Sequence, residues 1–79
     1  MSDNDAKIFF EKALKFFKEK KFDLVEKNFE DALKLAPGRV SILENLASIY
    51  LINKKFEKSE NALIQLDKKG VNNDKLDVF

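Results

Sequence analysis

The sequence predicts an all-α fold built from two stacked helical hairpins. The first observation is spacing, because apolar residues recur at helical intervals in four successive segments and nowhere alternate as in a β-strand. The second is an internal repeat, since the tripeptide Lys-Lys-Phe at residues 20–22 returns unchanged at residues 54–56. A repeat of fixed length in this range is typical of proteins that stack one supersecondary unit on the next.

Further residues recur at the same offset of 34 residues. Some pairs are identical and others exchange an aromatic residue for another large apolar one. The pairs are Ile8 with Ile42, Ala13 with Ala47, Phe16 with Tyr50, Phe17 with Leu51, Glu26 with Glu60, and Phe29 with Leu63. The recurrence covers both helices of each predicted hairpin, so it indicates one structural unit used twice.

In the first hairpin, residues 5–20 are expected to form one helix and residues 23–36 the next. A polar residue among positions 2–5 can cap the first helix, and Asp23 is the expected cap of the second. The second helix should stop at the dipeptide Pro37-Gly38, because proline cannot extend a helix and glycine supplies left-handed conformations.

In the second hairpin, residues 39–53 and residues 57–68 are the expected helices. The last of them should turn Leu63 and Leu66 inward. The sequence Lys-Lys-Gly at residues 68–70 is typical of a basic last helical turn followed by a glycine cap. We therefore expect a single domain over residues 1–79, with one repeat at about 5–38 and a second at about 39–71.

The C-terminal residues 72–79 fit neither repeat. A cap-rich turn is followed by residues that resemble the first turns of a fifth helix. They form either a capping turn at a frayed end or a partial third repeat in a fragment of a longer array. The second interpretation is favoured, because repeat arrays usually finish with a polar capping helix.

Composition excludes several classes of function. Fifteen basic and fourteen acidic residues give a net charge of +1, so no field favours nucleic acid or an anionic membrane. The chain has no cysteine and no histidine, which removes thiol chemistry, the usual general base and the commonest metal ligands. The N-terminus is acidic and polar and no long apolar run occurs, so a soluble cytoplasmic protein is expected.

With its length of 34 residues, the repeat resembles the tetratricopeptide repeat family. In the first repeat the residues that match the family pattern are Phe9, Ala13, Phe16, Val25, Phe29, Ala32 and Pro37. In the second they are Leu43, Leu46, Ala47, Tyr50, Ser59 and Leu63. The departures are Lys12 at an apolar position, Lys20 and Lys54 at the loop glycine, Leu66 at a small-residue site, and Val71 at the closing proline.

The resemblance covers about residues 6–71 and implies a fold with close helix contacts. Two tetratricopeptide-type antiparallel hairpins would form a right-handed superhelical stack, with a partial fifth helix at the C-terminus. Ala13 and Ala47 would lie where the two helices of a hairpin approach closely, opposite Val25 and Ser59. Phe16, Phe29, Tyr50 and Leu63 would fill the space between hairpins.

The resemblance also implies a partner-binding groove lined by the first helix of each hairpin. Its expected residues are Lys7, Phe10, Leu14, Phe17, Lys18, Ser41, Glu44, Asn45, Ser48, Leu51 and Ile52. Phe10, Leu14 and Phe17 are spaced as one stripe, opposite the apolar stripe that serves the fold. A peptide or a second copy of the chain could cover this stripe. The alternatives are burial under the N-terminal arm or simple exposure.

The expected function is therefore that of a scaffold for protein–protein interaction, with no cofactor, metal or catalytic residues. The rival interpretation is an oligomerisation or structural module, in a fragment of a larger multi-domain protein or enzyme. Binding of chaperone-tail carboxylates, known for one subset of the family, is disfavoured because Phe10 and Leu14 stand where that subset has polar residues. The acidic residues lack the spacing of a calcium loop, and no glycine-rich phosphate loop occurs.

Overall fold

The computed structural model describes residues 3–70, which form four α-helices and no strand. The helices are α1 (Asp3–Lys18), α2 (Phe22–Leu35), α3 (Val40–Ile52) and α4 (Phe56–Lys68). The predicted all-α class is thus confirmed, and the predicted helices differ from the observed ones by at most a few residues at each end. The turn and partial helix predicted for residues 72–79 lie outside the described residues, as do Val71 and one of the possible capping residues, Ser2.

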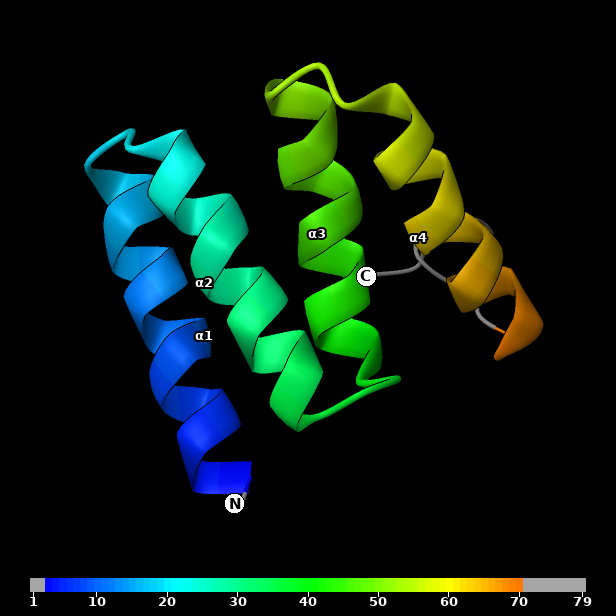
Figure 1. Ribbon diagram of the computed structural model, residues 1–79, viewed down its shortest axis with the longest axis horizontal. Helices are drawn as coiled ribbons and strands as arrows, with labels where there is room; N and C mark the ends of the chain where they lie inside the picture. The colour runs from blue at the N-terminus through cyan, green and yellow to red at the C-terminus, as the bar shows by residue number, and fades with distance from the viewer. Residues whose placement is uncertain (1–2, 71–79) are drawn as a thin grey trace.

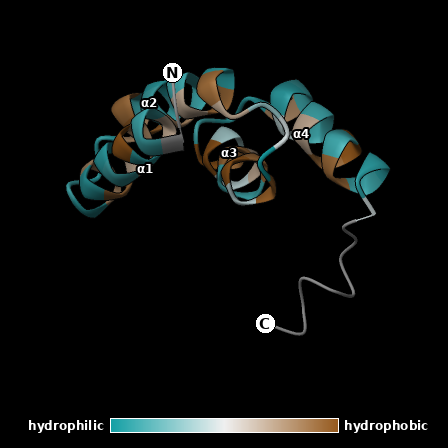
Figure 2. Cartoon of the chain, turned by 90° about the horizontal axis from the view of Figure 1, so that it is seen from below, coloured by the Kyte–Doolittle hydropathy of each residue, from teal (hydrophilic) through white to brown (hydrophobic). Residues whose placement is uncertain are grey.

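The helices follow one another in space in the order of the chain. α1 packs along α2, α2 packs along α3, and α3 packs along α4, so two hairpins meet through α2 and α3 (Figure 1). Every helix carries both hydrophobic and hydrophilic segments, drawn brown and teal (Figure 2), and the buried core is made of apolar residues from the four helices. α2 is therefore covered on two sides, by α1 and by α3.

The close contact within each hairpin depends on small residues. Ala13 and Val25 are fully buried between α1 and α2, as the sequence predicted. In the second hairpin Ala47 and Ser59 are also buried, and the Ser59 hydroxyl donates a hydrogen bond of 2.9 Å to the Ala47 carbonyl oxygen. This bond satisfies the one polar group at that contact, so serine can replace the valine of the first hairpin without leaving an unpaired hydroxyl.

The core between the hairpins is centred on Phe29. Its ring is 2% exposed, and it meets Phe10 edge-on, with ring centroids 5.3 Å apart and an interplanar angle of 67°. The residues of α3 that complete this core are Ile42, Leu46, Ile49 and Tyr50. Phe29 thus lies at the junction of three helices, and the predicted meeting of Phe29 and Tyr50 in one core is confirmed.

The repeated Lys-Lys-Phe tripeptide forms the turn of each hairpin. Lys20 and Lys54 both adopt a left-handed backbone conformation, each with a φ of 61°. The amide of the following residue then bonds back to the helix, from Lys21 to the Phe16 carbonyl at 3.0 Å and from Lys55 to the Tyr50 carbonyl at 2.7 Å. This is the hydrogen-bond pattern of a Schellman cap, which favours glycine at the left-handed position.

Two predictions of detail were wrong. Asp23 does not cap α2, which begins at Phe22 with Lys21 as its N-cap and no capping side-chain bond. Leu66 is buried as predicted, but Leu63 is 44% exposed. The inner face of α4 that packs on α3 is formed by Ser59, Ala62 and Leu66, and no helix among residues 3–70 covers the side on which Leu63 lies.

Candidate functional site

Most of the predicted groove residues of α1 are exposed, and one of them belongs to the core. Leu14 is 43% exposed and Phe17 is 46% exposed, although the Phe17 ring also contacts Phe22 edge-on at 5.6 Å. Lys7 in the second turn of the helix and Lys18 at its C-terminal end are both exposed. Phe10 is half-buried against Phe29, so the predicted spare apolar stripe is reduced to Leu14 and Phe17.

The second set of predicted groove residues lies on α3. Leu51 is 52% exposed and Ile52 is 45% exposed, which places two more large apolar side chains in solvent. Ser48 is exposed and Glu44 is half-buried. The side-chain amide of Asn45 donates to the Ser41 carbonyl of its own helix at 2.7 Å, so one of its two donor hydrogens is already engaged. We give the name α1–α3 surface to nine of the eleven predicted residues, namely Lys7, Phe10, Leu14, Phe17, Glu44, Asn45, Ser48, Leu51 and Ile52.

A cavity joins the beginnings of α1 and α3. Its volume is about 310 Å³, and it is lined by Asn4, Ala6, Lys7, Phe10, Arg39, Ser41 and Ile42. The structure thus brings Lys7 and Phe10 of the first repeat beside Ser41 of the second, as expected for residues of one groove. The cavity could hold a side chain of a partner, since it combines one aromatic wall with polar groups at its rim.

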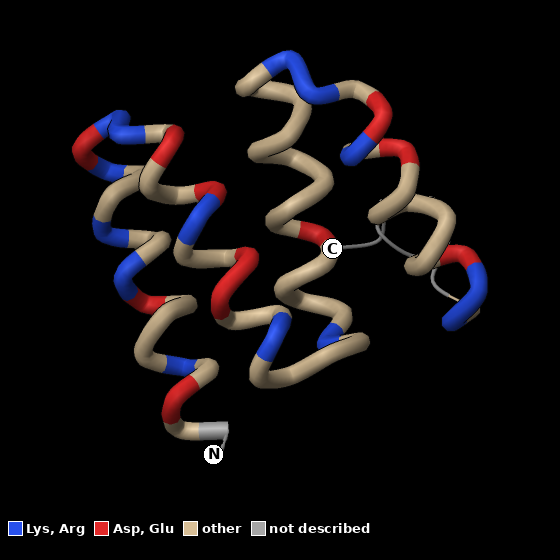
Figure 3. Tube along the Cα trace, in the orientation of Figure 1, with Lys and Arg blue, Asp and Glu red and all other residues tan. Residues whose placement is uncertain are grey.

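Charge is distributed unevenly along these helices. Lysines gather at the two hairpin turns, whereas α3 carries a single charged residue, Glu44 (Figure 3). α3 is therefore apolar on the sides that contact α2 and α4, and also at Leu51 and Ile52. The remaining side of α3 is polar along Ser41, Glu44, Asn45 and Ser48, and Leu51 and Ile52 continue the same stripe, so this side is a mixed surface with an apolar end.

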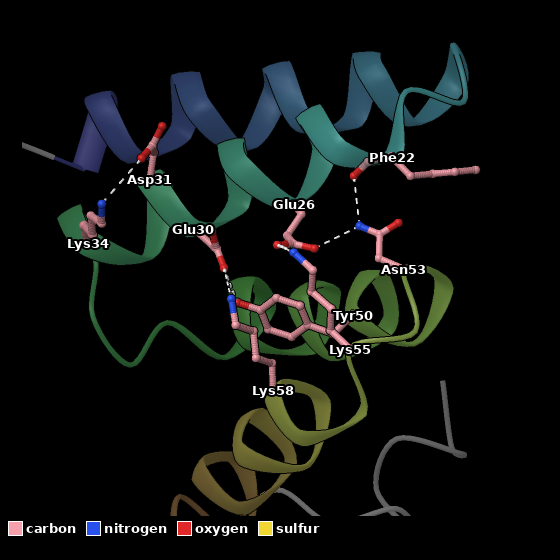
Figure 4. Close-up of polar contacts among 9 residues, drawn as sticks. All are labelled: Phe22, Glu26, Glu30, Asp31, Lys34, Tyr50, Asn53, Lys55 and Lys58. Carbon is pink, nitrogen blue, oxygen red and sulfur yellow. Dashed lines mark hydrogen bonds and ion pairs between the residues drawn. The ribbon is translucent and has the colours of Figure 1, made fainter.

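A polar cluster that was not predicted from the sequence joins the two hairpins (Figure 4). The Lys55 ammonium lies 2.6 Å from one oxygen of Glu26, and the Asn53 amide donates to the other at 2.9 Å. Glu30 accepts a hydrogen bond from the Tyr50 hydroxyl and lies 3.9 Å from the Lys58 ammonium. The signal was present in the sequence, because Glu26 and Lys55 both belong to pairs that recur at 34 residues.

The electrostatics of this cluster indicate a structural role. Burial alone would raise the pKa of the Glu26 carboxyl, but the hydrogen bonds from Lys55 and Asn53 outweigh it and lower the pKa below the ordinary value. The hydrogen bond to Glu26 in turn raises the pKa of Lys55. Both partners are held in their charged forms, whereas a general base would need a pKa near neutrality.

The rest of the described chain adds no site of another kind. Within residues 3–70, no group of three potential ligand side chains comes together as a metal site. No helix in the same range is long and apolar enough to cross a bilayer. Comparison of the chain with family models, curated proteins and solved structures found no match. The resemblance to the tetratricopeptide repeat family therefore stays a prediction from the internal repeat.

Proposed function

We propose that this chain is a tetratricopeptide-type repeat domain that binds a protein partner, as a peptide or a helix, across the α1–α3 surface. The 34-residue repeat, the small residues at the two close contacts and the shared turn all support this assignment. In the proposed arrangement the two hairpins form a right-handed superhelical stack, with α1 and α3 along its concave side.

The observation that carries the proposal is the exposure of large apolar side chains on both first helices. Leu14 and Phe17 on α1, and Leu51 and Ile52 on α3, are each more than two-fifths exposed. Side chains of this size gain about 1.5–3 kcal/mol each when they become fully buried, so their exposure favours association. An amphipathic segment fits best, because it would place its apolar face on these residues and acidic groups near Lys7 and Lys18.

The alternative function is that of an oligomerisation or structural module within a larger protein. It is favoured by a different set of exposed apolar residues, on α4, which lie away from the α1–α3 surface. The two functions therefore make separate predictions for separate variants.

Selection from a displayed library of helical peptides tests the proposal. Peptides enriched on the native chain should bind the double variant Leu14→Gln/Leu51→Gln at least about tenfold more weakly, which corresponds to about 1.4 kcal/mol. The matched control is Ile64→Gln on α4, whose side chain is 45% exposed and which should leave peptide binding unchanged. Circular dichroism should show native helicity in all three proteins. Equal binding to the native chain and the double variant, or no enrichment at all, would contradict the proposal.

A further inference from the structure

One face of α4 is exposed where the corresponding face of α2 is covered. Phe29 on α2 is 2% exposed because both α1 and α3 contribute to the core around it, whereas its 34-residue equivalent, Leu63 on α4, is 44% exposed. Phe56 and Ile64 on the same helix are 63% and 45% exposed. The α2–α3 junction inside the chain therefore shows what kind of element the exposed face of α4 could accept.

The first contact of the internal junction is the ion pair between Glu26 and Lys55, at 2.6 Å. Their 34-residue equivalents are Glu60 on α4 and Lys21 at the first turn, so both residue types are kept. Both equivalents are exposed, Lys21 with 57% of its side chain in solvent. They lie at opposite ends of the two-hairpin stack, so they could form the same pair only between two copies.

The second contact is polar in the internal junction, whereas the equivalent residues at both ends of the stack are apolar. In the internal junction Glu30 is paired with the Tyr50 hydroxyl and lies near Lys58. The equivalent of Glu30 is Ile64, and the equivalents of its two partners are Phe16 and Leu24. Three polar residues inside the chain thus correspond to three apolar residues at the two ends of the stack. Of these, Ile64 is 45% exposed and Leu24 is 39% exposed.

The third contact is apolar in the internal junction, whereas the equivalent residues at the two ends of the stack are charged. Leu33 and Leu46 line one cavity at the internal junction, and Leu46 is 1% exposed. The equivalent of Leu33 is Asp67 on α4, and the equivalent of Leu46 is Lys12 on α1. An apolar contact inside the chain therefore corresponds to a pair of opposite charges between the ends. At all three contacts the two ends of the stack remain complementary to each other.

We propose that copies of this chain associate head to tail, with α1 and the first turn of one copy packing on α4 of the next. The exposed face of α4 is Phe56, Glu60, Leu63, Ile64 and Asp67, and the facing residues of the next copy are Ile8, Lys12, Phe16, Lys21 and Leu24. The internal α2–α3 junction is the template for this contact. Because the two faces differ, the contact is heterologous and adds further copies in one direction unless the rotation closes a ring.

The junction between copies is weaker than the internal one. The equivalent of the buried Ile49 is Lys15, which brings a charge to an apolar position. The equivalent of Asn53 is Glu19, which would lie near Glu60, although Glu19 is already paired with Lys21 at 3.3 Å. Association should therefore depend on concentration, with assembly in the range from micromolar to millimolar rather than a permanent oligomer.

Sedimentation velocity on the full chain, measured as a concentration series, tests the proposal. The average mass of the native protein should rise continuously with concentration, without a plateau at the dimer. Ile64→Asp blocks the α4 face and Leu24→Asp blocks the opposite end, so each variant alone should remain a monomer. An equimolar mixture of the two variants retains one intact face of each kind and should give a dimer that grows no further.

The controls separate this proposal from its rivals and from the peptide-binding function. Leu14→Gln on the α1–α3 surface should leave the association unchanged, and circular dichroism should confirm that all variants are folded. A Leu24→Asp variant that still dimerises would indicate a symmetric α4–α4 contact and overturn the proposal. A native chain that remains a monomer at every concentration would also overturn it, and would leave the α4 face to another occupant, such as residues 71–79.

Discussion

Replacing Phe29 by alanine should remove a large share of the stability of this protein. The ring is 2% exposed, lies at the junction of α1, α2 and α3, and meets Phe10 edge-on at 5.3 Å. Truncation of a buried phenylalanine typically costs about 3–5 kcal/mol, because apolar burial is lost and a cavity remains. A chain of 79 residues has a total free energy of unfolding of about 4–12 kcal/mol, so the variant should be marginal or unfolded.

The equivalent position in the second repeat supplies the matched control. Leu63 is 44% exposed, so Leu63→Ala loses only part of the 1.5–3 kcal/mol that complete burial of such a side chain contributes, or about 1 kcal/mol. Urea denaturation followed by helical circular dichroism, at a concentration where the protein is monomeric, measures both losses. Nearly equal losses for the two variants would refute the covered state of Phe29 and the exposed state of Leu63, and with them the stacking of α3 on α2.

Two further predictions concern the turns and the polar cluster. Lys20→Gly and Lys54→Gly should each raise the free energy of unfolding by up to about 1 kcal/mol, because glycine adopts the φ of 61° without the strain of a side chain. A loss of stability in urea titrations of either variant would contradict the assigned turn. Because the pKa of Glu26 is lowered on folding, its ionised form contributes stability above pH 4.5, its ordinary value, and this contribution disappears as the pH falls through the folded pKa. The difference in unfolding free energy between the native chain and Glu26→Gln should therefore shrink on acidification, and a constant difference would exclude this role.

Much of the fold could be predicted from the sequence, because its signals are local or periodic. The spacing of apolar residues located the four helices, and the repeated tripeptide located the two turns. Ala13 and Ala47 were assigned to close helix contacts from the resemblance to the tetratricopeptide repeat family, and both are buried. The candidate site could be predicted only as a set of residues on the first helices. The structure shows that Phe10 is shared with the core, whereas Leu14 and Phe17 remain exposed.

The sequence by itself determined which residues lie together on a helix face, since that depends on a period of 3.6 residues along one chain segment. Only the tertiary structure decided which faces are covered, since coverage depends on a neighbouring helix from another part of the chain. Phe29 and Leu63 occupy equivalent positions in two similar helices, yet α1 and α3 together bury Phe29, whereas no following helix among the described residues packs on α4 at Leu63. The buried carboxylate of Glu26 likewise gains an ion pair because the α3–α4 turn brings the partly exposed Lys55 to it from the second hairpin.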